Sequence, residues 1–279
     1  MMIVMKYFQS VDDYINCIQV CKNFEEIPDM FRYNPLPYSK AVGRLFPNIQ
    51  TQYVYSYFDE RKEDIDRFTI MHRCLYKEYL QQNTEDEEKI VRYTKVLLER
   101  GDQIENGTIP EVITDIGNKC FMGKMIQSIQ MSTRVTSLGE CNFMDCLHLT
   151  EVTLSPYLQH LPQKTFANCK NLRSLTMPKE LLSIGEECFY NCSSLTTIEL
   201  SPWISALERS TFSKCSQLKS IILPTNLKRI EESCFSNCSQ LQSIVVPQSV
   251  TWIGAFSFHH CSSLERIQLP SNLTILKDD

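Results

Sequence analysis

The chain has 279 residues, of which 43% are hydrophobic, and its formal net charge is −5. This length predicts one or two domains. Acidic side chains outnumber basic ones both in residues 1–108 and in the remainder, which argues against binding of nucleic acid through its phosphates. The sequence lacks the run of about 18 apolar residues that a membrane-spanning helix needs.

The first structured segment is predicted to be a helix. Ser10 and Asp13 have the spacing of a capping box, in which each side chain bonds to the backbone N–H of the other residue. Apolar residues follow at helical spacing, so we expect this helix to run to about Phe24. A short helix is expected over residues 39–46, and the aromatic, partly alternating residues 49–55 predict a strand.

Two longer helices are predicted in the rest of this region. Apolar residues at spacings of three and four predict one helix over residues 65–79. A second capping box at residues 84–87 predicts another helix, which continues through residues 90–98 and stops at Gly101. We therefore expect residues 1–104 to form a mainly α-helical N-terminal domain that caps the first of the repeats that follow.

The remainder of the chain, residues 109–279, carries an internal repeat of 23 residues. In most units a cysteine follows a phenylalanine by three residues, and a leucine follows it by six. The phenylalanines in this register are Phe121, Phe143, Phe166, Phe189, Phe212, Phe235 and Phe258. About seven apolar positions recur in each unit, and a unit this small cannot bury them alone. The units must therefore stack on one another, which predicts a repeat solenoid.

Each 23-residue coil is expected to contain a short β-strand, with turns making up the rest. The alternation of apolar residues that predicts the strand is best seen at Leu218, Ile221 and Leu223. Pro224 ends this strand, because proline cannot donate the next hydrogen bond of a ladder.

These coils resemble a known class of repeat. Residues 223–247 read LPTNLKRIEESCFSNCSQLQSIVVP, and the pattern is similar to the BspA-like class of leucine-rich repeats. The resemblance covers residues 109–276 and recurs in every unit. It implies a binding surface, which in members of that class is often found on cell surfaces or in contacts with host and matrix.

Residues 10–24 have a second resemblance. Their sequence, SVDDYINCIQVCKNF, is similar to the latter part of an F-box, in which a short acidic turn precedes a helix. The opening Leu-Pro helix of that motif is missing or reduced to residues 3–8. The resemblance implies contact with a cullin-linked adaptor, while the repeats would capture substrates for ubiquitin ligation. The matching positions are Asp12, Asp13, Val20, Cys21, Lys22 and Phe24.

The chain has 13 cysteines, and most of them follow the repeat register. A cysteine tied to a core register is most simply a small buried hydrophobe. Disulfides between stacked coils are the alternative, but parallel Cβ vectors fit their geometry poorly. We therefore expect free thiols in a reducing, cytoplasmic location, and the first eight residues are too short for a signal-peptide core.

The sequence shows no arrangement of residues that would support catalysis. It lacks a phosphate-cradling glycine loop and a nucleophile elbow. Cys17 and Cys21, with His72 and Cys74, have a spacing that could suggest a zinc set, but a shared helix face explains the two cysteines better. We expect no cofactor, no metal and no enzymatic activity. The sequons at Asn191 and Asn237 directly precede repeat cysteines, and we expect their amides to cap the turn backbone rather than to carry a glycan.

A protein partner is expected on the regular strand face of the solenoid. Ile222 and Val245 occupy equivalent outward positions on adjacent coils and predict a small apolar patch, although ordinary β-propensity on a solvated sheet would explain them equally well. A second set of candidates is aromatic, because exposed tryptophan and tyrosine often anchor interfaces. The candidate residues are Arg173, Glu199, Lys219, Ile222, Val245 and Gln268, with Tyr157, Trp203 and Trp252 as the aromatic set.

These features favour a non-enzymatic protein–protein interaction scaffold. An F-box-type substrate receptor of a cullin ubiquitin ligase is the alternative function. A surface or secreted adhesin is a second alternative, and it would require an export route.

Overall fold

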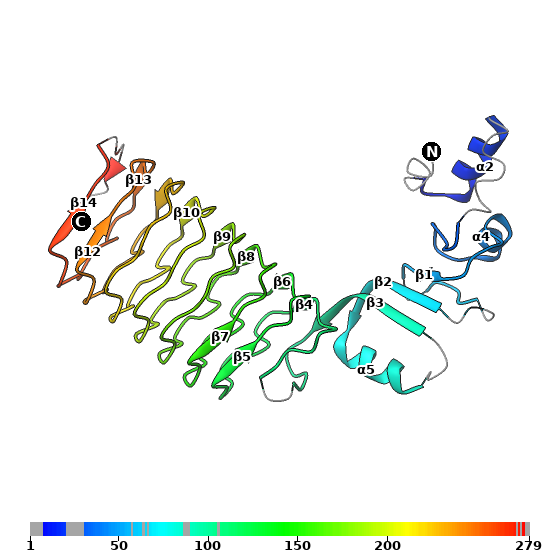
Figure 1. Cartoon of the computed structure of the whole chain (residues 1–279), viewed down its shortest axis with the longest axis horizontal. Helices are drawn as coiled ribbons and strands as arrows, with labels where there is room; N and C mark the ends of the chain where they lie inside the picture. The colour runs from blue at the N-terminus through cyan, green and yellow to red at the C-terminus, as the bar shows by residue number, and fades with distance from the viewer. Residues whose placement is uncertain are drawn as a thin grey trace. The chain divides into compact units, whose positions relative to one another are not determined.

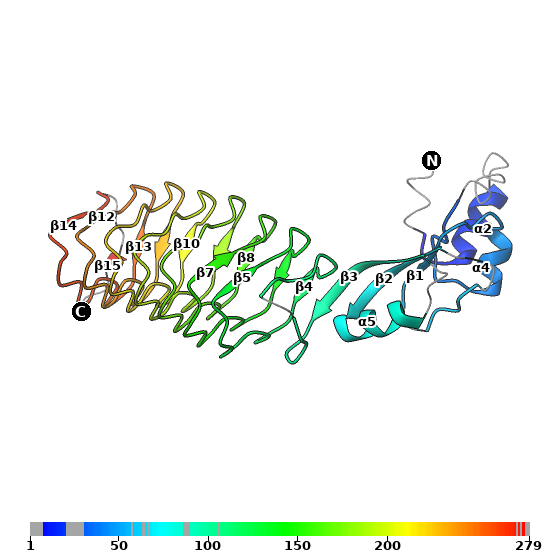
Figure 2. The same cartoon turned by 60° about the horizontal axis from the view of Figure 1, so that its bottom comes forward.

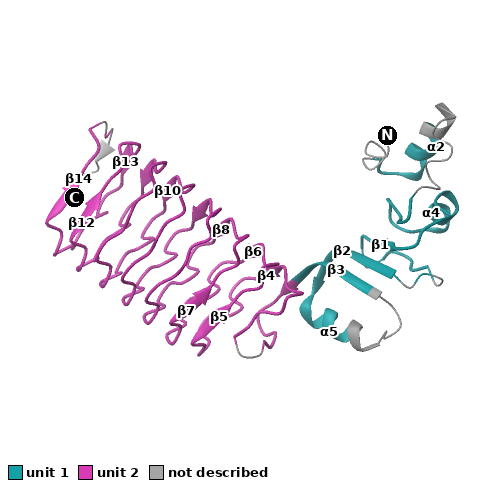
Figure 3. Ribbon diagram, in the orientation of Figure 1, with its two compact units in different colours: residues 1–96 teal, residues 97–279 magenta. Residues whose placement is uncertain are grey.

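The computed structural model describes residues 8–20, 31–56, 58–62, 65, 67–85, 90–104, 107–271, 273 and 275–276. The chain forms two compact units, residues 1–96 and residues 97–279 (Figure 3). The first unit combines helices with a small sheet, and the second is the repeat solenoid.

The helix predicted after Ser10 is present as α2 (Val11–Val20). Ser10 Oγ accepts a hydrogen bond from the Asp13 N–H, and Asp13 Oδ2 accepts one from the Ser10 N–H at 2.9 Å. The capping box is therefore confirmed. The predicted continuation to Phe24 lies outside the described residues.

The short helix predicted over residues 39–46 is also confirmed, as α4 (Lys40–Leu45). Ser39 begins it, since Ser39 Oγ accepts a hydrogen bond from the Val42 N–H. The buried rings of Tyr14 and Phe46 pack edge to face, with centroids 5.0 Å apart, and join α2 to the segment that follows α4.

A three-stranded array completes the N-terminal unit. β1 (Gln52–Val54), the strand predicted there, pairs in parallel with β2 (Arg67–Leu75). β2 lies next to β3 (Ile90–Leu98), and α5 (Tyr76–Glu85) connects the two along the chain (Figure 1). Tyr79 of α5 packs edge to face on Tyr93 of β3, with ring centroids 5.1 Å apart.

The helix predicted over residues 65–79 is wrong for most of its length, because residues 67–75 form β2. The buried side chains alternate along the strand, at Phe68, Ile70 and Cys74, while Met71 of the expected helical stripe is exposed. Both periods fit this short apolar stretch, and β-branched Ile70 sits well on a pleated surface.

The helix predicted from residue 84 is wrong as well, because residues 90–98 form β3. β-branched residues are dense in IVRYTKVLL, and their restricted χ1 favours a strand. The expected capping box instead overlaps the end of α5 at Glu85, and residues 86–89 lie outside the described residues. A mainly α-helical N-terminal domain is therefore not supported.

The C-terminal unit is a stack of coils whose strands form two ladders of parallel pairs (Figures 1 and 2). The ladder that the sequence predicted contains β5 (Ser128–Gln130), β7 (Glu151–Thr153), β12 (Ser243–Val245) and β14 (Arg266–Gln268). Between β7 and β12 it is reduced to the isolated bridges Thr153↔Thr176 and Glu199↔Ile222. The outward side of this ladder is called the strand face below.

The second ladder was not predicted, because each coil gives it only two residues. Its strands are β4 (Asp115–Ile116), β6 (Ser137–Leu138), β8 (His160–Leu161), β9 (Ser183–Ile184), β10 (Ala206–Leu207), β11 (Arg229–Ile230), β13 (Trp252–Ile253) and β15 (Ile275–Leu276). Leu97 and Leu98, which end β3, pair with β4 and so cover the first edge of this ladder.

The repeat phenylalanines form one continuous stack inside the solenoid. Neighbouring ring centroids lie 5.1–5.6 Å apart and the ring planes are within 14° of parallel. The rings from Phe121 to Phe235 are at most 1% exposed, and only the last ring, Phe258, is half-buried. This register is the one the sequence predicted.

Two residues in each coil adopt left-handed backbone, two positions before and two positions after the phenylalanine. Their φ angles lie between 53° and 62° except at Gly123, where φ is 70°. Asparagine and aspartate tolerate this conformation better than other residues that have a side chain, which accounts for the asparagines at the later position. The residues at that position are Gly123, Asp145, Asn168, Asn191, Lys214, Asn237 and His260.

Candidate interaction surface

The strand face carries its most exposed apolar side chains at two adjacent coils. Ile222 is 81% exposed and Val245 is 59% exposed, whereas the inward neighbours Ile221 and Ile244 are 6% and 2% exposed. The two outward residues occupy equivalent positions one coil apart, and neighbouring strands lie about 4.8 Å apart. Together they form the apolar patch that the sequence predicted.

A groove of about 510 Å³ lies beside this patch. Its lining includes the outward residues Thr176, Glu199 and Ile222. The groove follows three successive coils, in the region where the ladder is reduced to isolated bridges. The strand face therefore offers a recess as well as a patch.

The charged candidates lie on the same face. Arg173 and Lys219 are exposed and belong to one row of residues, because the Thr196 N–H donates to the Arg173 carbonyl and the Lys219 N–H donates to the Thr196 carbonyl. Glu199 and Gln268 are exposed in the outward row of Ile222 and Val245. The structure thus brings Arg173, Glu199, Lys219, Ile222, Val245 and Gln268 to one surface.

Tyr157 and Trp203 project from equivalent turns two coils apart, where they are 64% and 55% exposed. Each turn is held by a buried serine, because Ser155 Oγ and Ser201 Oγ accept hydrogen bonds from the Tyr157 and Trp203 N–H groups. The same hydroxyls donate to carbonyls of the preceding coil. These rings are available to a partner at the margin of the strand face.

Trp252 is placed elsewhere. It begins β13, in the second ladder, and is half-buried. The Arg229 guanidinium lies 5.5 Å from its ring centroid and forms an ion pair with Glu231 at 2.6 Å. One ring face is therefore occupied, and the structure does not bring Trp252 together with the strand-face candidates.

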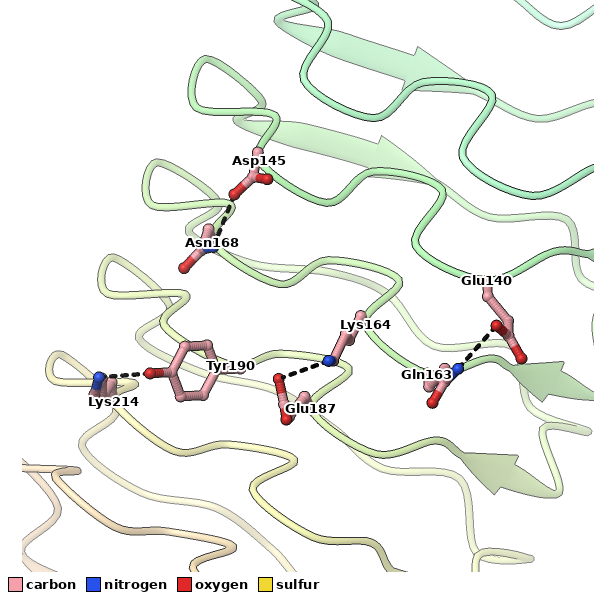
Figure 4. A network of polar contacts seen from close by, with 8 residues as sticks. All are labelled: Glu140, Asp145, Gln163, Lys164, Asn168, Glu187, Tyr190 and Lys214. Carbon is pink, nitrogen blue, oxygen red and sulfur yellow. Dashed lines mark hydrogen bonds and ion pairs between the residues drawn. The ribbon is translucent and has the colours of Figure 1, made fainter. Parts of the chain in front are cut away.

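A different edge of the solenoid carries a row of polar contacts between coils (Figure 4). Asn168 Nδ2 donates to Asp145 Oδ1 at 2.7 Å, and Asn191 Nδ2 donates to Asn168 Oδ1 at 2.9 Å. Lys214 Nζ bonds to the Tyr190 hydroxyl further along this edge. The Asn191 amide thus bonds to a side chain of the previous coil, and the Asn237 amide donates to the Ser236 hydroxyl of its own coil at 2.9 Å. Both contacts correct the expectation that these amides cap the turn backbone.

The candidate adaptor-binding segment is only partly described. Asp12 is exposed in the first turn of α2, and Val20 ends that helix. Asp13 is engaged in its own helix cap, and the hydrogen bond from the Ser10 hydroxyl lowers the pKa of its carboxyl below the ordinary value. Cys21 and Phe24 lie outside the described residues, so an F-box function stays a prediction.

The cysteines whose side chains the structure describes are free thiols, as the sequence predicted. Burial raises the pKa of the Cys188 and Cys215 thiols to about 12, which keeps them protonated and weakly nucleophilic at neutral pH. Among the described residues, no three His, Cys, Asp or Glu side chains gather as a metal site would require. In the same part of the chain, no helix is both long and apolar enough to cross a membrane.

The stacked coils, the phenylalanine column and the patterned strand face define a leucine-rich repeat solenoid. Residues 99–202 and 182–279 match the BspA type leucine rich repeat region, in six copies, and the chain belongs to this family. Leucine-rich repeat proteins are generally protein-interaction or surface proteins, and the solenoid is typically a non-enzymatic binding scaffold. The match leaves residues 10–24 outside it.

Two solved structures illustrate the similarity. The leucine-rich repeat protein of T. pallidum is 22% identical, with a TM-score of 0.50, over 61% of this chain and 78% of that chain. This likeness supports the solenoid fold. A leucine-rich cell surface protein from Faecalibacterium prausnitzii is 20% identical, with a TM-score of 0.45, over 80% of this chain and 73% of that chain. No curated protein matches the chain.

Proposed function

We propose that this protein is a non-enzymatic scaffold that binds a protein partner on the strand face, centred on Ile222 and Val245. The observation that carries the proposal is the exposure of these two apolar side chains, 81% and 59%, on adjacent coils. Exposure of apolar surface to water is unfavourable, so covering the patch with a partner lowers the free energy. Adjoining apolar residues on a surface are typical of interaction sites.

The surroundings of the patch support a protein as the partner. The groove on one side can take a side chain of the partner, since it is a recess that Ile222 itself borders. Arg173, Glu199 and Lys219 provide both signs of charge around it. An apolar centre with a charged rim is the usual composition of a protein interface.

The test compares partners recovered from the native cell by the whole chain and by the double variant Ile222→Glu/Val245→Glu. Both side chains point outward, so the variant is expected to fold with an unchanged melting temperature. Partners of the strand face should be recovered at least tenfold less well, because two buried charges would be unpaired in the interface. Leu182→Glu is the control, since Leu182 is 43% exposed but lies outside the strand-face patch and groove.

Equal recovery with the double variant and with the control would show that the partner binds elsewhere. Tyr157→Ala and Trp203→Ala then identify the margin of the strand face as the site if either one alone reduces recovery.

A further inference from the structure

The N-terminal unit contains a basic, aromatic pocket of about 290 Å³ that the repeats do not involve. It is formed by four neighbouring pieces of chain: the segment at Tyr33, then β1, β2 and β3. The residues that line it are Arg32, Tyr33, Thr51, Tyr53, Arg67, Phe68, Thr69 and Arg92. It is therefore a composite site whose parts are distant in sequence.

The walls of the pocket are held in place by the backbone. Tyr53 lies opposite Thr69 across the β1–β2 pair, and Tyr33 stacks on Tyr53 with ring centroids 4.6 Å apart. Fully buried Asn34 fixes Tyr53 from the other side: its Oδ1 accepts from the Tyr53 N–H at 2.5 Å and its Nδ2 donates to the Tyr53 carbonyl at 2.6 Å. The aromatic wall is thus preorganised rather than adaptable.

The charge of the pocket is one-sided. Arg67 and Arg92 line it from neighbouring strands and Arg32 from a third segment, and none of the eight described residues that line it is acidic. Arg67 and Arg92 place like charges at one pocket, so the arrangement favours an anion between these two guanidinium groups. Their planar forks match the oxygens of a phosphate, and the Tyr and Thr hydroxyls can donate further hydrogen bonds.

We propose that this pocket binds the phosphorylated side chain of a protein partner. A phosphate ester carries close to two negative charges near neutral pH, which suits the two guanidinium groups of Arg67 and Arg92 better than the single charge of a carboxylate does. Small-molecule sites usually exceed roughly 300 Å³, whereas this pocket is at the lower limit of size. It suits one side chain that a larger molecule presents. Clusters of arginine are a recurring solution for phosphopeptide recognition.

The experiment is a calorimetric titration of the whole chain with phenyl phosphate, which carries the ring and phosphate of a phosphotyrosine side chain. We expect saturable binding of one phenyl phosphate per chain. Arg67→Ala and Arg92→Ala should each weaken it about tenfold or more, because each removes charge-assisted hydrogen bonds. Arg67→Lys should retain part of the affinity, since lysine keeps the positive charge but loses the bidentate hydrogen bonding of the guanidinium group. Both arginines are exposed, so the variants should melt like the parent chain.

Arg266→Ala is the matched control, because it removes an exposed arginine of the solenoid and changes the net charge equally. An equal loss of affinity in this control would reduce the effect to non-specific charge and overturn the proposal. Absence of saturable binding of phenyl phosphate at millimolar concentration would also overturn it. Inorganic phosphate binding as tightly as phenyl phosphate would mean a simple anion site instead of one for a phosphorylated side chain.

Discussion

Each repeat cysteine joins two coils through its thiol. Cys192 Sγ donates to the Phe166 carbonyl of the preceding coil at 3.1 Å, and the same contact recurs at 3.0–3.2 Å in the other coils. The carbonyl already accepts the Cys169 N–H of its own coil, so the thiol uses its second lone pair. Cysteine supplies a small apolar volume and a weak donor at once, which alanine and valine cannot do.

The buried thiols predict a loss of stability in alkali. Burial raises the pKa of Cys188 and Cys215 to about 12 from an ordinary value near 9. Below pH 9 both folded and unfolded chains hold these protons, but between pH 9 and about 12 only the folded chain does. We expect the free energy of unfolding to fall through this range, by up to about 1.4 kcal/mol per pH unit for each thiol.

Urea unfolding at a series of pH values measures this slope. Cys215→Ala removes one contributing thiol, so its slope should be shallower whatever its effect on absolute stability. A stability that stays level from pH 9 to about 11 would contradict the assignment of these thiols to the core.

At the scale of the coil, the phenylalanine column is the main continuous element of the core. Phe189 is fully buried and its ring lies 5.5 Å from Phe166 and 5.4 Å from Phe212. Parallel offset rings at this distance gain contact on both faces. Removal of one ring therefore leaves a cavity lined by two others, which backbone tied to both neighbouring coils cannot close.

We expect Phe189→Ala to lower the free energy of unfolding by about 3–5 kcal/mol, because the cavity adds to the lost apolar burial. Chemical denaturation of the whole chain measures the change. Thr197→Ala, an exposed substitution of the same coil, should stay within about 0.5 kcal/mol of the parent. An unchanged melting temperature for Phe189→Ala would refute the register of the repeat.

The coils could be predicted from sequence because the same apolar pattern recurs in every unit. A unit whose own pattern is ambiguous is therefore assigned by its neighbours. β2 could not be predicted, because its apolar residues fit both periods and the segment occurs only once. The helical period fits Phe68, Met71 and Leu75, and the strand period fits Phe68, Ile70 and Cys74. Tertiary pairing with β1 decided between the two periods.

The surface features divide in the same way. The patch at Ile222 and Val245 could be predicted, because the repeat fixes which side chains point outward. The pocket of Arg32, Arg67 and Arg92 could not, since only the arrangement of neighbouring strands brings these residues together. Sequence spacing predicts sites built from equivalent positions of the repeat, but it does not predict sites assembled from unrelated segments.

At the scale of the whole solenoid, burial is uneven along the stack. Ile244 and Val246 are 2% and 1% exposed, but their equivalents in the last described coil, Ile267 and Leu269, are 40% and 41% exposed. A repeat protein is stabilised by its intrinsic repeat terms and by each interface between neighbouring coils. The coil at β14 has fewer such contacts, so it should open at lower free energy than the coils before it.

The pair Ile244→Ala and Ile267→Ala tests this gradient with one chemical change at equivalent positions. We expect the first to cost about 2–5 kcal/mol and the second about 1 kcal/mol or less, because the side chain of Ile267 is already half in water. Hydrogen exchange should show the same order, with the amides of β14 exchanging before those of β12. Equal costs would mean that Ile267 is buried in solution, and a concentration-dependent mass would then identify self-association through this coil as the cause.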